Sequence, residues 1–152
     1  NENSGIMDYT GFPNFEYFVN LDNIESMGNS TFLEVPMTVV KNKTYFDLLK
    51  INQFSTRVIN RINPELSWLR PNTKNIKDMM KITDVIYRDN TEYAEFMLHS
   101  SELMPGGSPL FDTNYKIETL YADIECLFSH ISGRFHGMTL GSFYQKKMEN
   151  RT

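Results

Sequence analysis

The sequence predicts an α/β fold in which parallel strands alternate with helices. Two apolar runs, 32–40 and 93–98, have the length and the β-branched or aromatic content of buried strands. Each run is followed by segments whose apolar residues recur at helical spacing. Because this alternation is typical of βαβ units, we expect the strands to pair in parallel. Two strands make too small a sheet for an independent domain, so either residues 1–28 contain further strands or the chain is part of a larger fold.

Composition favours one globular domain and argues against nucleic acid as a partner. The chain has 152 residues, 40% of them hydrophobic, and a net charge of -4. This length suffices for one core and is short for two. Lysine and arginine are scattered, whereas binding phosphates requires a positive face. No apolar run approaches the roughly 20 residues that cross a bilayer, and the N-terminus lacks the layout of a signal peptide, so we expect no membrane span.

The first element in chain order, residues 1–28, has little periodicity but many aromatic side chains. We expect an irregular segment, a loop or lid, because so many aromatic residues would seek burial. In the strand 32–40 that follows, Pro36 cannot donate to a ladder and predicts a strand end, an edge or a bulge. Glu34, a carboxylate within this apolar run, is expected to face solvent, a partner or a site.

Helices are expected at 44–49 and 53–62, where the pattern ends before Pro64 because the residue preceding a proline avoids the helical region. The next helix is capped by Asn72 or Thr73. Its shared face is formed by Ile76, Met79, Met80, Thr83 and Ile86.

The longest predicted helix spans about 112–131, with Asp112 or Thr113 as its cap. Cys126 falls on its apolar side and is expected to be buried, and a lone cysteine excludes a disulfide within the chain. Thr139 is expected to cap a short helix that follows.

Polar side chains at the end of the second strand are the candidate site. The run 93–98 is followed directly by His99, Ser100, Ser101 and Glu102, and then by a loop that contains Gly106-Gly107. A buried strand that delivers polar groups at its C-terminal end is how α/β sheets build sites. His99 can act as a general acid or base, or it can satisfy a backbone carbonyl. Glu102 can orient His99, bind a substrate hydroxyl or cap the loop.

The stretch from Leu98 to Pro109, Leu-His-Ser-Ser-Glu-Leu-Met-Pro-Gly-Gly-Ser-Pro, resembles the late motif of polysaccharide deacetylases of the NodB-homology family. It is similar in particular to members from bacterial polysaccharide gene clusters. Trp68-Leu69-Arg70-Pro71, the run 33–38 and the helix 112–131 follow in the expected order. The resemblance covers about 24–139.

This resemblance implies the C-terminal portion of a distorted (β/α) barrel and a cytoplasmic bacterial enzyme that removes N-acetyl groups from carbohydrate. His99 would be the catalytic acid that protonates the departing amine, and Ser100, Ser101 and Glu102 would bind or orient substrate. The family uses a divalent metal, but its metal ligands and base belong to motifs that are not found in this chain. The chain alone is therefore expected to bind no metal and to be inactive. A half-barrel also exposes sheet edges, which a homodimer would cover.

A function of another class stays open. The chain can equally be a non-catalytic α/β module, whose aromatic N-terminal segment and Gly-Pro loop form a carbohydrate- or protein-binding surface.

Overall fold

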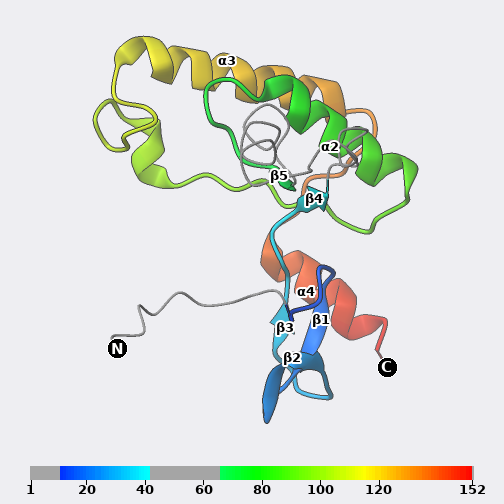
Figure 1. The fold of residues 1–152 in the computed structure, drawn as a ribbon. Helices are drawn as coiled ribbons and strands as arrows, with labels where there is room; N and C mark the ends of the chain where they lie inside the picture. The colour runs from blue at the N-terminus through cyan, green and yellow to red at the C-terminus, as the bar shows by residue number, and fades with distance from the viewer. Residues whose placement is uncertain (1–10, 42–65, 152) are drawn as a thin grey trace, which may run out of the picture. The chain divides into compact units, whose positions relative to one another are not determined.

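The computed structural model describes residues 11–41 and 66–151. The helices expected at 44–49 and 53–62 lie outside these described residues. The chain divides into two compact units. Unit 1 takes the residues up to Pro36 and those from Gly137 onward, and unit 2 is Met37–His136. The fold therefore mixes helices with small sheets, drawn in Figure 1.

Unit 1 contains a three-stranded antiparallel sheet. Its strands are β1 (Tyr17–Asn20), β2 (Asn23–Met27) and β3 (Leu33–Glu34), in the order β2-β1-β3. Only two residues separate β1 from β2, and a connection this short allows antiparallel pairing alone. The expectation of an irregular segment is therefore wrong for 17–27. Strand-like alternation does exist there, since the side chains of Tyr17 and Val19 are buried, but it extends over only four residues.

Helix α4 (Leu140–Glu149) completes unit 1, and its start is as predicted. The Thr139 hydroxyl accepts a hydrogen bond from the Ser142 N–H at 3.1 Å and so caps the helix. Phe143 supplies the buried face. Beyond the helix, the Arg151 guanidinium lies 4.2 Å from the ring centroid of Phe18 in β1 and donates to the carbonyl of Ser30 at 2.6 Å. The last residues of the described chain thus pack on its first strand.

The described part of unit 2, residues 37–41 and 66–136, has two short strands and two long helices. Strand β4 (Val39–Lys41) pairs antiparallel with β5 (Leu66–Trp68). Helix α2 (Ile76–Arg88) follows β5, and α3 (Asn114–Ile131) comes after the candidate-site segment. Both helices were predicted, and Thr113 caps α3 by accepting from the Lys116 N–H at 3.3 Å.

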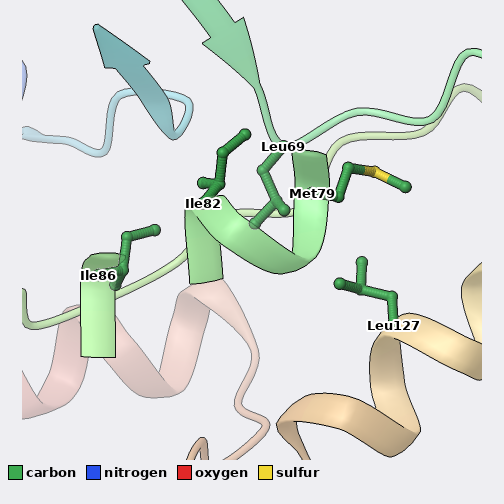
Figure 2. Packing of buried hydrophobic residues seen from close by; sticks show 5 residues of the cluster. All are labelled: Leu69, Met79, Ile82, Ile86 and Leu127. Atoms are coloured by element: carbon green, nitrogen blue, oxygen red, sulfur yellow. The ribbon is translucent and has the colours of Figure 1, made fainter. Parts of the chain in front are cut away.

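The core of unit 2 lies between α2 and α3. Helix α2 buries three of the five residues of its predicted face, whereas Ile76 and Met80 are half-buried, and it also buries Ile82, which the prediction omitted. Leu127 of α3 and Leu69 from the segment after β5 complete the cluster (Figure 2). Its fully buried members are Leu69, Met79, Ile82, Ile86 and Leu127. A second cluster joins Phe111 to Ile117 and Leu120 of α3. The two clusters fix the segment between α2 and α3 at both of its ends.

Strand pairing differs from the sequence-based expectation. Every strand pair within 11–41 and 66–151 is antiparallel, and no closed barrel is formed by these residues. The run 32–40 is divided into β3 and β4 on either side of Pro36, in agreement with its predicted effect. The run 93–98 is not a strand: its contacts include one hydrogen bond from the Met97 N–H to the Leu69 carbonyl at 3.1 Å and one from the Glu95 N–H to the Thr38 hydroxyl at 2.8 Å.

Candidate functional site

The segment Ser100–Leu103 forms one 3-10 turn, η2, and Glu102 is its only buried side chain. One carboxylate oxygen of Glu102 accepts the main-chain N–H of His99 at 3.0 Å, and the other accepts Arg70 Nη2 at 2.7 Å. The Glu102 N–H also donates to the His99 carbonyl at 2.9 Å. This reciprocal arrangement is the glutamate half of a capping box, and it holds the backbone of His99 in place.

The Glu102 carboxyl stays ionised in this setting. Burial alone would raise its pKa, but the hydrogen bonds from the His99 N–H and from Arg70 outweigh burial and hold the pKa below its ordinary value. A carboxylate with a lowered pKa is a poor proton donor. Glu102 is only 2% exposed, and both its carboxylate oxygens accept hydrogen bonds from protein donors. Its role is therefore to orient the turn and not to bind a substrate hydroxyl.

His99, Ser100 and Ser101 lie together on the exposed surface of the turn. The backbone of His99 is extended, with φ of -85° and ψ of 142°, and the turn begins after it. Its side chain is therefore accessible while its backbone is anchored by Glu102. The exposed His99 is thus carried by a backbone that Glu102 holds in place.

The glycine loop after the turn packs directly against it. A Cβ on Gly107 would stand 2.1 Å from the main-chain oxygen of Ser101, so no larger residue fits. Gly106 has a φ of 77°, a conformation that favours glycine. The Gly106 N–H reaches the carbonyl of Phe111, which is fully buried in the second core cluster. Gly107 thus packs against η2, and Gly106 is hydrogen-bonded to a residue of the second core cluster.

Arg70 connects the turn with a pocket. A cavity of about 500 Å³ is lined by side chains from β5, the loop after it, the start of α2 and the loop before α3: Leu66, Ser67, Trp68, Arg70, Pro71, Asn72, Asn75, Asp78 and Leu110. The volume is within the range of small-molecule sites. Arg70 therefore lines the pocket while its guanidinium holds Glu102, and its Nε is buried with no hydrogen-bond partner in the described part of the chain.

The described residues do not fit the divalent metal that the resemblance implies. Within the ranges that the structure covers, no three His, Cys, Asp or Glu side chains gather closely enough to hold a metal ion. His130, for example, binds Asp84 at 2.8 Å, and the same carboxylate oxygen accepts Arg134 Nη1 at 2.7 Å. Hydrogen bonds from Arg134 and His130 lower the pKa of Asp84, so this cluster joins α2 to α3 and the residues just after it.

One sequence-based expectation is wrong, and one contact of the site was not predicted. Cys126, expected to be buried, is exposed on α3. The link from Arg70 to Glu102 was not foreseen because the two residues are 32 positions apart and no periodic pattern relates them. A buried carboxylate needs a paired donor, but the sequence does not show that Glu102 is buried.

Comparison of the chain with protein-family models, with curated proteins and with solved structures gives no match. None of the helices in the described ranges combines the length and hydropathy that a membrane span requires.

Proposed function

We propose that this chain contributes to a carbohydrate N-deacetylase, in which His99 protonates the departing amine. The observation that supports it most is the relay of contacts from the pocket to the turn. Arg70 lines the pocket and binds Glu102, and Glu102 binds the backbone of His99. His99 does not itself line this pocket, so the support lies in the chain of contacts that joins the pocket to an exposed histidine.

The chemistry assigned to this chain is one proton transfer. Hydrolysis of an acetamide adds water to the carbonyl carbon, and the C–N bond of the resulting tetrahedral species then breaks. The nitrogen leaves as an amine only if it takes up a proton, and the His99 imidazolium would supply it. Ionised Glu102 stays in place during this step and keeps the His99 backbone fixed.

The wider architecture belongs to the same proposal. The (β/α) barrel would require parallel strands beyond those of the described residues. The divalent metal would be held by residues outside this chain, and no step assigned here uses it. The homodimer and the cytoplasmic location stay predictions.

The test is acetate release from N-acetylglucosamine oligomers by the full-length parent protein. We expect His99→Ala to lower kcat by about two orders of magnitude or more, the usual scale for a general acid. His136→Ala removes another exposed histidine of unit 2 and should leave the rate unchanged. A His99→Ala enzyme as fast as the wild type would refute the assignment.

A non-catalytic carbohydrate-binding module is the second candidate. The observation that favours it is the pocket itself, because Trp68 and the polar side chains beside it can bind a ligand without any reacting group. Saturable binding of the same oligomers by a parent protein that releases no acetate, with or without added divalent metal, would select this candidate.

A further inference from the structure

We propose that Asn72 is the specificity-determining residue of the pocket and that Thr73 holds it in position. The proposal rests on the proposed function only in taking the ligand to be a carbohydrate. The loop between β5 and α2 contributes four of the lining residues, Arg70, Pro71, Asn72 and Asn75.

Thr73 has a backbone conformation that its side chain disfavours. Two non-glycine residues in the described ranges have a positive φ, Thr73 at 72° and Asn90 at 52°. Asparagine tolerates the left-handed region, whereas a β-branched residue there is strained. Such strain persists where the surrounding structure enforces it, and it is concentrated at ligand-binding and catalytic sites.

Three hydrogen bonds enforce the strained conformation. The Asn72 N–H donates to Asn75 Oδ1 at 2.9 Å, and the Lys74 N–H donates to Asn72 Oδ1 at 3.2 Å. The Asn75 side-chain amide then donates to the carbonyl of Arg70 at 2.8 Å. The loop is thus closed onto Arg70, the residue that also binds Glu102. Both polar atoms of the Asn75 side chain are used within the protein, so Asn75 shapes the wall.

Asn72 is left with a donor for a ligand. Its Oδ1 is used by Lys74, but no contact of its Nδ2 is found among the described residues, and the side chain is exposed in the pocket lining. Asp78 lines the same wall and offers carboxylate oxygen as an acceptor. Trp68, 44% exposed, adds an aromatic surface. A donor, an acceptor and an aromatic surface suit a ring that has hydroxyl groups and an apolar face.

The charges of the pocket indicate that this ring is neutral. Arg70 is paired with Glu102, and Asp78 is paired with Lys81 at 3.2 Å. The lining thus contains one positive and one negative side chain, Arg70 and Asp78, and has no excess of either sign. A neutral hexose unit that forms hydrogen bonds suits such a lining.

The chain offers a direct reporter of this binding. Trp68 is its one tryptophan, and it lines the pocket. Its fluorescence can be titrated in the 152-residue chain with N-acetylglucosamine tetramer and, for comparison, with the glucose tetramer that lacks acetamide groups. We expect a saturable change in emission with at least one of them. No change with either tetramer would overturn the proposal.

Asn72→Asp is the central variant, because it keeps the oxygen that accepts from Lys74 and loses the amide donor. We expect its affinity for the bound tetramer to fall about fivefold, the usual effect of one neutral hydrogen bond, and unequally for the two tetramers. Lys74→Ala changes the same loop outside the pocket lining and should bind within about twofold of the wild type. An Asn72→Asp chain with wild-type affinities would overturn the assignment.

Thr73 is tested by separating stability from binding. Thr73→Gly removes the strain but frees the loop, so we expect unchanged or higher resistance to urea together with weaker binding, about threefold or more. Thr73→Asn tolerates the same φ and should bind within about twofold of the wild type. Binding that simply follows stability in both variants would show that Thr73 has only a structural role.

These outcomes are independent of the catalytic proposal. If His99→Ala leaves acetate release unchanged while Asn72→Asp weakens binding, the catalytic assignment fails and the pocket assignment stands. The reverse pair of results refutes the pocket assignment alone.

Discussion

Arg70 Nη2 donates to Glu102 Oε1 at 2.7 Å, and this contact joins the strand-to-helix loop of unit 2 to the turn that presents His99. The Glu102 side chain is 3% exposed and that of Arg70 30% exposed. The Glu102 carboxylate is therefore almost completely shielded from water, whereas Arg70 is partly exposed. Removing one member of such a pair leaves the other charge poorly solvated, which makes the contact testable by stability.

Arg70→Ala is expected to destabilise the protein by about 2 kcal/mol, because Glu102 keeps its burial and loses a charged donor. Urea unfolding followed by circular dichroism measures the change. Arg88→Ala is the control, since Arg88 and its partner Asp89 are mostly exposed and such surface pairs contribute little to stability. Equal losses in the two variants would contradict a special role for the contact between Arg70 and Glu102.

The same carboxylate predicts a pH dependence. Because the pKa of Glu102 is lower in the folded protein, its stabilising contribution is present above its ordinary pKa of about 4.5 and is lost as the pH falls below that value. We expect Glu102→Gln to be less stable than the wild type at pH 7, and the difference to shrink between about pH 5 and pH 3. Thermal unfolding of both proteins across this range checks the sign. A gap that widens on acidification would refute it.

Gly107→Ala is expected to cost about 2 kcal/mol, because the added methyl group meets the Ser101 carbonyl oxygen and the loop must shift. Gly133→Ala provides the matched control, since a Cβ there has no neighbour within 4 Å, and it should change stability by less than about 0.5 kcal/mol. Urea midpoints of the two variants give the comparison. Similar midpoints would show that the glycine loop does not pack against the turn in solution.

The exposed thiol of Cys126 gives a prediction that needs no assumption about function. A disulfide reagent such as dithionitrobenzoate should modify Cys126 in the native protein within a few-fold of the rate in urea, because the thiol is accessible in both states. Cys126→Ala should be silent in the assay and nearly unchanged in stability. A native thiol that reacts only after unfolding would instead support the burial that its helical position suggests.

Helices were the most predictable part of this fold. The buried face of α2 and the threonine caps of α3 and α4 depend on local spacing and on hydrogen bonds within four residues, which the sequence displays directly. The cap of α2 was misplaced, since Asn75 and not Asn72 or Thr73 precedes its first turn. The Asn75 side chain makes no cap hydrogen bond to α2 and binds the Asn72 N–H and the Arg70 carbonyl instead, so residue preference alone did not identify the start of this helix.

The sheets were less predictable because strand pairing is not local. The direction of β4 relative to β5 depends on residues 25 or more positions apart, as in the pair of Lys41 with Leu66. The candidate site likewise has a part that was predictable from local sequence and a part that was not. The cluster of polar residues at 99–102 was visible in the sequence, whereas Arg70 and the pocket depend on tertiary contacts. Cys126 was misjudged because the apolar stripe of α3 is wider than the face that is buried.

The division of the chain into two units affects the order in which they form. Unit 1 combines the first and last parts of the chain, whereas unit 2 is one continuous segment between them. During synthesis, unit 2 can complete its core as soon as His136 has left the ribosome, because domains fold as their residues become available. Unit 1 must hold its strands β1 to β3 without α4 until residues 140–149 have been synthesised. Its early strands are thus the part of this protein most exposed to non-native pairing, and a nascent chain stalled before Thr139 should carry a folded unit 2 beside an incomplete sheet.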